Sequence, residues 1–286
     1  MSAVLFALCS AALFGSLSVT LRSALRRQPD PEAGALATAL VALVPCGSVA
    51  LASWDWGGRV WPFLLAGLLA PGGSQILYVL AIRDAGPSRT AVLVGTAPLV
   101  SVTIALAALG EPVSAALVLG AVLIVLGGAV LAGEQVRPDT FRGVGVLFAL
   151  ASAAFFATRD NLVRHLATGS SVQPQLAASA TIVAGLAVMA GYLLVRRSPG
   201  RTIRDVRAAL RPFAPSGLVW GLSYVFLFEA FYRGRVSVVS PLVATESLVG
   251  VLLAAFLLRR SELVGRHLWI GACLVVAGGA LIGALR

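Results

Sequence analysis

Four ionisable side chains lie inside long apolar stretches of this 286-residue chain, namely Arg159, Asp160, Glu229 and Glu246. A charge at the centre of a bilayer costs roughly 2.5–3.5 kcal/mol on insertion scales, so such groups usually face a cavity and take part in function. Glu246 is about ten residues into its stretch, which places it near the midplane at 1.5 Å per residue. A carboxyl group there could exchange a proton or hold an amine, and an arginine could bind a substrate carboxylate through two hydrogen bonds. The structural alternative for Glu246 is a hydrogen bond to a neighbouring helix end.

The other three residues also have structural interpretations. Asp160 and Arg164 are four residues apart and could pair along a helix, while Arg159 could extend towards the membrane surface. Glu229 has Arg233 four residues further on, and this spacing favours pairing at Glu229. A role in a binding site and a role in pairing therefore both stay open for these residues.

Composition indicates the elements that must position these side chains. Hydrophobic residues make up 58% of the chain and charged residues 12%, whereas soluble domains are about a quarter charged. The apolar stretches are about 20 residues long, enough to cross a hydrocarbon core of roughly 30 Å as helices. The sequence predicts an all-α integral membrane protein with ten transmembrane helices at 2–22, 33–53, 61–82, 88–109, 113–132, 141–164, 174–195, 212–232, 236–258 and 263–285.

The chain contains an internal duplication. The segment VLFALCSAALF at Val4–Phe14 recurs as VLFALASAAFF at Val146–Phe156. Two units, 1–135 and 140–286, then hold five predicted spans each. Because five is odd, the second unit would enter the membrane in the opposite orientation. Inverted repeats are typical of secondary transporters, which expose a site between the repeats alternately to each side.

The arginines predict the orientation of the chain. All 22 basic residues are arginine, and 16 of them lie in connections after odd-numbered spans. By the positive-inside rule these connections are cytoplasmic and both termini are outside. The net charge of +10 is therefore interpreted as a topology signal, and no nucleic-acid partner is expected.

One of these connections, Ser198–Arg211, is unusually long and basic. It carries four arginines with apolar residues between them, at Arg201, Arg204, Arg207 and Arg211, and at Ile203, Val206 and Leu210. As a helix it would lie on the anionic inner leaflet with its apolar side down. The favoured interpretation is a basic loop that only fixes the topology.

Several kinds of chemistry are excluded by composition. Without lysine the chain has no phosphate-loop lysine and forms no Schiff base. His165 and His267 are far apart, and the three cysteines lie inside apolar spans. We therefore expect no metal site, no cofactor and no enzymatic activity. Glycines in the fifth and tenth spans indicate close helix packing, possible also against a partner chain, so a monomer and a homodimer both stay open.

Short motifs occur at corresponding places in both units. The first unit has Phe14-Gly15-Ser16, Pro98, Gly110-Glu111 and Gly120, and the second has Phe156-Ala157-Thr158, Ser240-Pro241-Leu242, Glu246, Glu262 and Gly271. With these motifs the chain resembles the EamA-type, ten-helix branch of the drug/metabolite transporter superfamily. It departs from the family pattern at Phe14, Pro112 and Ser247, where Trp, Arg and Pro are more usual. The resemblance implies transport of amino acids, other metabolites or drugs, often in exchange for protons.

The charged residues are confined to the second unit. Aligning the units pairs Arg159 with Leu17, Asp160 with Ser18, Glu229 with Leu80 and Glu246 with Ala97. The first unit would supply a less polar wall. We predict a central cavity lined by the first, third, fourth, sixth, eighth and ninth spans, whose substrate- and proton-binding residues are Glu246, Arg159, Asp160, Gln75, Tyr78, Thr96 and Glu229.

The sequence thus favours a multi-pass transporter of the inner (plasma) membrane that exports a small metabolite, amino acid or drug. Apolar surroundings favour the protonated form of a carboxyl group, so proton coupling is possible. An uncoupled facilitator is the nearest alternative. From other classes, the chain could be a scaffold subunit or a membrane-embedded enzyme, although an enzyme would need clustered His, Asp or Lys at the headgroup level.

Overall fold

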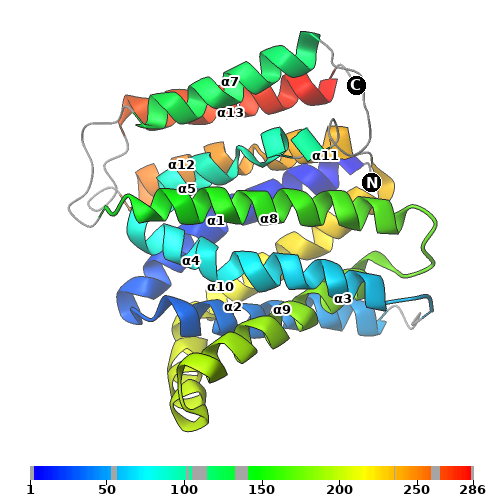
Figure 1. Cartoon of the computed structure of the whole chain (residues 1–286), viewed down its shortest axis with the longest axis vertical. Helices are drawn as coiled ribbons and strands as arrows, with labels where there is room; N and C mark the ends of the chain where they lie inside the picture. Colours follow the sequence, from blue (N-terminus) through cyan, green and yellow to red (C-terminus); the bar gives the residue numbers. More distant parts are fainter. Residues whose placement is uncertain are drawn as a thin grey trace.

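The computed structural model describes residues 3–52, 57–100, 103–104, 115–132, 141–234, 236–258 and 265–284. Within these ranges the ordered elements are all helical (Figure 1). In chain order they are α1 (Ala3–Arg27), α2 (Pro31–Ala52), α3 (Trp61–Gly67), η1 (Leu68–Gly73), α4 (Ser74–Ala85), α5 (Pro87–Val94), α7 (Ala115–Ala132), α8 (Val144–Ala167), α9 (Pro174–Arg196), α10 (Pro199–Arg233), α11 (Val236–Val243), α12 (Glu246–Leu257) and α13 (Arg266–Ala284). The motif residues Gly110-Glu111, Pro112 and Glu262 lie outside the described residues.

Six of the described helical segments are long and apolar enough to cross a membrane. They are α1, α2, the run from α3 through α4, α8, α9 and α10, and shorter apolar helices accompany them. Exposed leucines and valines cover the outer faces of several helices, as expected where lipid replaces water. The prediction of an all-α membrane protein is therefore confirmed.

The fourth predicted span of each unit is interrupted near its middle. A turn at Gly95-Thr96 follows α5, and a turn at Ala244-Thr245 separates α11 from α12. The Thr96 hydroxyl donates to the Leu93 carbonyl at 2.6 Å, and the Thr245 hydroxyl donates to the Leu242 carbonyl at the same distance. Threonine hydroxyls can compete for backbone carbonyls in this way. The two predicted spans 88–109 and 236–258 are therefore broken helices.

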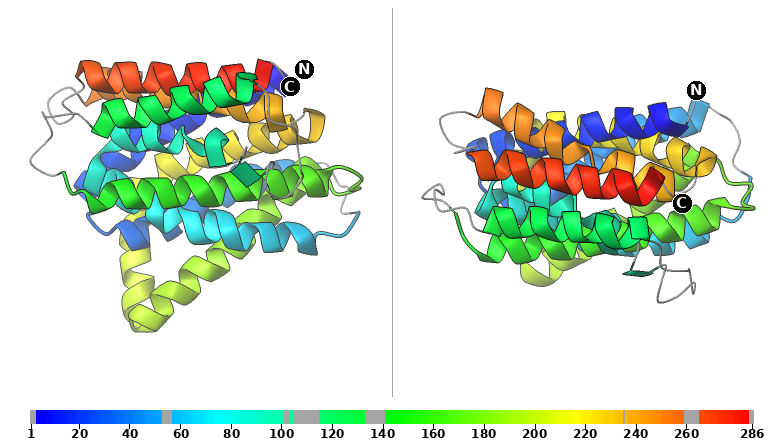
Figure 2. Two further views of the ribbon diagram at one scale, coloured as in Figure 1. Left: turned by 45° about the horizontal axis from the view of Figure 1, so that its top comes forward. Right: turned by 90° about the horizontal axis from the view of Figure 1, so that it is seen from above.

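Helices α7 and α13 pack against each other through glycine. A Cβ atom added to Gly127 would lie 2.8 Å from the Gly271 carbonyl oxygen, and one added to Gly278 would lie 2.5 Å from that of Gly120. The two contacts run in opposite chain directions, so the helices are antiparallel, side by side at one edge of the bundle (Figures 1 and 2). The glycine surfaces predicted from the sequence therefore face each other inside this chain.

An arginine near the end of the first helix of each unit binds the end of another helix. Arg22 donates to the carbonyls of Ile82 and Arg83 at 3.4 and 3.0 Å. Arg164 donates to the carbonyls of Phe231 and Tyr232 at 2.7 and 3.5 Å. Basic side chains commonly bind carbonyls at the ends of helices, and the Ile82 carbonyl also accepts from the Gly86 N–H at 3.2 Å.

These contacts correct one sequence-based interpretation. Asp160 and Arg164 were expected to be able to pair along the helix, but Arg164 is directed to the backbone at the end of α10. The equivalent contact of Arg22 lies at the end of α4, which is at the opposite end of the bundle (Figure 1).

The connection at Ser198–Arg211 is helical. Helix α10 begins at Pro199 and continues to Arg233, with Pro212 and Pro215 inside it. The favoured loop interpretation was therefore wrong. Its early part runs across the direction of the bundle helices, at the end where α1, α4 and α9 also finish (Figures 1 and 2). Each of those three helices carries arginine in its last turn.

Arg197 joins three helices at this end of the bundle. Its guanidinium contacts Asp30 before α2, Glu32 in the first turn of α2 at 2.6 Å, and Asp205 in α10 at 3.2 Å. Asp30 also accepts from the Ala33 N–H at 3.1 Å, which satisfies one free donor at the start of α2. Burial raises the pKa of Asp30, but the hydrogen bonds from Arg197 and Ala33 outweigh burial, and the net pKa lies below its usual value of 3.8.

We expect Arg197→Gln to lower the free energy of unfolding by about 1.5–3 kcal/mol, the range for hydrogen bonds to charged groups. A carboxyl whose pKa is lowered by folding stabilises the protein above its unfolded pKa, and that stability is lost as pH falls through the folded pKa. The parent should therefore lose stability below about pH 4, and the variant should lose less over the same interval. Thermal unfolding in detergent at several pH values measures both. Arg201→Gln, at a more exposed arginine 3.4 Å from Asp205, is the control and should change little.

Candidate functional site

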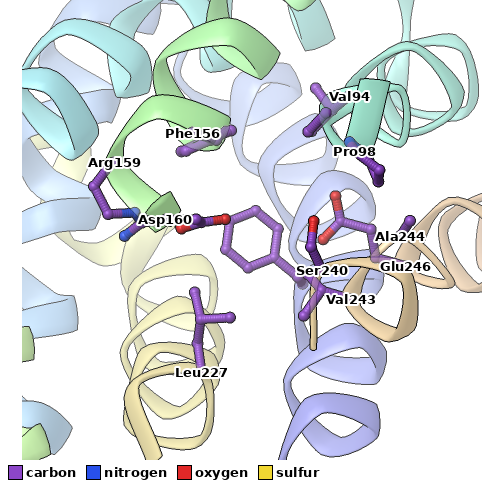
Figure 3. Close-up of a pocket in the computed structure, with 12 residues that line it drawn as sticks. Val94, Pro98, Phe156, Arg159, Asp160, Leu227, Ser240, Val243, Ala244 and Glu246 are labelled. Atoms are coloured by element: carbon purple, nitrogen blue, oxygen red, sulfur yellow. Dashed lines mark ion pairs between the residues drawn. The ribbon is translucent and has the colours of Figure 1, made fainter. Parts of the chain in front are cut away.

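A small cavity lies between the two units at the interrupted helices. Its volume is about 30 Å³, room for about one water molecule. Side chains from both units line it (Figure 3): Phe14, Val94, Ala97, Pro98, Phe156, Arg159, Asp160, Leu227, Ser240, Val243, Ala244 and Glu246. Its walls are mostly apolar, so the few charged groups dominate its chemistry.

Glu246 is placed by the break between α11 and α12. It is the first residue of α12 and is only 6% exposed. A carboxylate is favoured at this position, because the N–H groups at a helix start carry partial positive charge. Figure 3 shows its carboxyl group at one wall, facing the space between Pro98 and Ser240. Among the described residues, the structure gives Glu246 no ion-pair partner.

The close approach of α1 to this break depends on Gly15. A Cβ atom at Gly15 would lie 2.7 Å from the Glu246 carbonyl oxygen and 2.7 Å from the Val249 Cβ. No side chain larger than hydrogen fits there without movement of the backbone. The glycine of the motif Phe14-Gly15-Ser16 therefore lets the first helix of one unit touch the interrupted helix of the other.

Arg159 and Asp160 form a buried ion pair on the opposite wall. The Arg159 Nε atom lies 2.7 Å from Asp160 Oδ1, and the two residues are 1% and 9% exposed. The guanidinium also lies 4.8 Å from the Tyr224 ring centre and within 6 Å of the Phe156 and Phe228 rings. Such distances are attractive for a cation over aromatic faces. The expectation that Arg159 could reach the membrane surface was wrong.

Aromatic rings fill the junction of the two units beside the cavity. Phe14 and Phe156, which occupy equivalent positions in the sequence repeat, meet edge to face at 5.8 Å. Tyr78 packs on both rings at about 6 Å and is 2% exposed. It therefore lies behind the lining residues. Gln75, one turn earlier in α4, is fully buried, and its amide atoms have no hydrogen-bond partner within the described part of the chain.

The remaining predicted site residues are further away. Thr96 lies in the turn that follows α5, between the lining residues Val94 and Ala97. Its hydroxyl donates to the Leu93 carbonyl. Glu229 is outside the cavity, near the end of α10, where it accepts hydrogen bonds from Gln175 and from Arg233 at 2.6 Å. The structure thus brings together Glu246, Arg159 and Asp160. It places Glu229 in a separate, more open hollow.

The sequence analysis did not identify the ring cluster around Arg159. Trp220, Tyr224 and Phe228 are four residues apart on α10, which puts them along one face of that helix. Neighbouring rings in this row are 5.0 and 5.7 Å apart. The four-residue spacing was the available signal.

The family model described as EamA-like transporter family matches residues 1–133 and 143–284. The chain belongs to this family. The resemblance found in the sequence motifs is therefore confirmed, and membership of this family indicates that the EamA-like protein is a multi-pass membrane transporter. Family membership also implies a small-molecule substrate.

Other comparisons address the fold. No curated protein matches this EamA-like chain. A crystal structure of another protein aligns with 98% of this chain and 95% of its own, at 21% identity and a TM-score of 0.63. At that identity the likeness shows a shared fold.

Proposed function

We propose that this EamA-like protein is a secondary transporter that exports a small metabolite, amino acid or drug across the inner (plasma) membrane. The observation that carries the proposal is the cavity between the units, where Glu246 faces the Arg159–Asp160 pair among apolar walls. A pocket with few charged groups and apolar surroundings suits a small amphipathic substrate.

An inverted relation between the units would give this cavity alternating access. Support comes from contacts that occur twice. Gly127 against Gly271 is repeated as Gly278 against Gly120, and Arg22 on the end of α4 is repeated as Arg164 on the end of α10. The paired contacts are antiparallel or at opposite bundle ends, as a two-fold axis in the membrane plane requires. We propose ten spans in two inverted sets of five.

Glu246 is our candidate for coupling. Asp160 is compensated by Arg159, so an ionised Glu246 would leave one unpaired negative charge in the cavity. An unpaired charge in apolar surroundings is costly. Binding of a proton or of an amine group would remove that cost. The same carboxyl group could therefore hold protons and substrate in turn.

The interrupted helices give the cavity a means to change shape. Discontinuous helices near the midplane form the binding sites of several transporter families. A cavity of about 30 Å³ is too small for a metabolite. Substrate binding therefore requires movement of its walls, and the turns at Gly95-Thr96 and Ala244-Thr245 are the proposed places where the backbone bends.

Inside-out membrane vesicles test the proposal. Substrates would first be found by thermal-shift screening of the purified protein, and their uptake would then be measured with and without a proton gradient. Uptake driven by an acidic lumen supports a proton-coupled exporter. Equal uptake without the gradient indicates the facilitator, and binding without uptake would contradict transport.

The orientation makes a separate prediction. Reporter fusions at Arg204 should report cytoplasm, because that residue lies at the arginine-rich end of the bundle. Fusions at Gly58 and at the C-terminus should report the outer side. The opposite pattern would reverse the orientation but would leave the inverted relation between the units intact.

A further inference from the structure

The early part of α10, residues 199–213, is a basic helix that the transport proposal leaves unused. We call it the surface helix. It projects from the side of the bundle away from α7 and α13, beside the end of α9, while the rest of α10 runs among the other helices (Figure 1). Pro212 and Pro215 lie at the change between the two parts, and proline is a common cause of helix bending.

One side of the surface helix is fixed to the protein. Thr202, Val206, Ala209 and Phe213 are buried, and their spacings of three and four residues place them on a single helix face. The Phe213 ring packs on α2, where a Cβ atom at Gly34 would lie 2.3 Å from it. The helix therefore has a set rotation about its own axis.

Next to this buried face is an exposed apolar edge. Ile203 is 67% exposed and Leu210 is 36% exposed. They are seven residues apart, two helical turns, so they lie on the same side. Exposed apolar residues beside a row of charges would be unfavourable in water. They suit the boundary between headgroups and acyl chains.

The arginines form the next face around the helix. Arg204, Arg207 and Arg211 follow at spacings of three and four residues, and all three are exposed, as is Arg201. Asp205, on the far side of this face, contacts Arg197 and lies 3.4 and 3.6 Å from Arg201 and Arg204. Among the described residues, Arg207 and Arg211 have no acidic partner.

We propose that the surface helix binds anionic phospholipids at the membrane surface. Ile203 and Leu210 enter the acyl boundary, and Arg204, Arg207 and Arg211 contact the lipid phosphates. Continuity with the membrane-crossing part of α10 holds the helix at this depth. The arginine-rich end of the bundle is the predicted cytoplasmic end, where anionic lipids attract basic segments. Charge, apolar edge and position thus agree on a lipid surface as the partner.

The test counts phosphatidylglycerol bound to the full-length protein by native mass spectrometry, in competition with phosphatidylcholine. For Arg207→Gln combined with Arg211→Gln, we expect the affinity for phosphatidylglycerol to fall about thirtyfold, from the contribution of two basic residues at an anionic surface. Arg26→Gln with Arg27→Gln is the matched control. It removes two exposed arginines at the same end of the bundle but outside the surface helix, and should retain the affinity. Equal losses in the two double variants would overturn the assignment to this helix.

Two further double variants and one competitor separate the parts of the proposal. Ile203→Ser with Leu210→Ser should also weaken binding, and unchanged affinity would contradict insertion of the apolar edge. Arg207→Lys with Arg211→Lys keeps both positive charges and should keep most of the affinity for phosphatidylglycerol. This variant tests the role of charge independently of how well the glutamine double variant folds. Inorganic phosphate, added at constant ionic strength, should not displace the lipid. Displacement would show a site for free phosphate instead.

Discussion

Glu246→Gln should abolish gradient-driven transport while the protein remains folded and inserted. Glutamine has nearly the same size and can still form hydrogen bonds, but it cannot exchange a proton. Glu246 is 6% exposed at the start of α12 and has no ion-pair partner among the described residues, so its removal leaves no opposite charge unpaired. Uptake into inside-out vesicles between about pH 5 and pH 8 measures the effect.

The matched control is Glu229→Gln. Like Glu246, this carboxyl group belongs to the second unit, but it lies outside the cavity and accepts hydrogen bonds from Gln175 and Arg233. Its substitution should leave the dependence on the proton gradient intact. If Glu246→Gln transports like the parent over the whole pH range, Glu246 has the structural role that glutamine can also fill, and coupling occurs elsewhere.

The positions of helices were predictable because apolar stretches of membrane length are a strong signal. The breaks at Gly95-Thr96 and Ala244-Thr245 were not predicted, because each lies within a stretch long enough to be interpreted as one continuous span. Neither threonine marks a break by itself, because Thr20 and Thr181 form the same hydroxyl–carbonyl bond inside continuous helices. The sequence identified Glu246 as a candidate because it lies about midway along its span. Its position as the first residue of α12 could not be predicted, because it results from the break.

Ion pairs were less predictable than spans. The four-residue spacing made Arg164 a candidate partner of Asp160, with a role in a binding site left open. That spacing considers only contacts between side chains, and takes no account of backbone groups. Arg164 instead binds backbone carbonyls at the end of α10, which have no signature in sequence. The ion-pair partner of Asp160 is instead the adjacent Arg159, whose Nε atom lies 2.7 Å from Asp160 Oδ1.

The pair formed by Arg159 and Asp160 makes the second large prediction. Arg159→Gln alone should destabilise the protein by about 3–5 kcal/mol, because it leaves a buried carboxylate without its partner. Asp160→Asn alone should also destabilise it, by leaving the guanidinium unpaired. The double variant removes both charges and should recover much of the loss, which thermal unfolding of the four proteins would show as a coupling energy.

The double variant also separates structure from substrate binding. If Arg159 binds a substrate carboxylate, the folded double variant should lose affinity for anionic substrates by about ten- to a hundredfold, the range for a charge-assisted hydrogen bond. Affinity for cationic substrates should change much less, because Glu246 is still present. Binding constants for one acid and one amine of similar size decide the matter. If both substrates bind the double variant as they bind the parent, the guanidinium serves only to compensate Asp160 beneath the rings of Tyr224 and Phe228, and Glu246 is left as the charged group that meets the substrate.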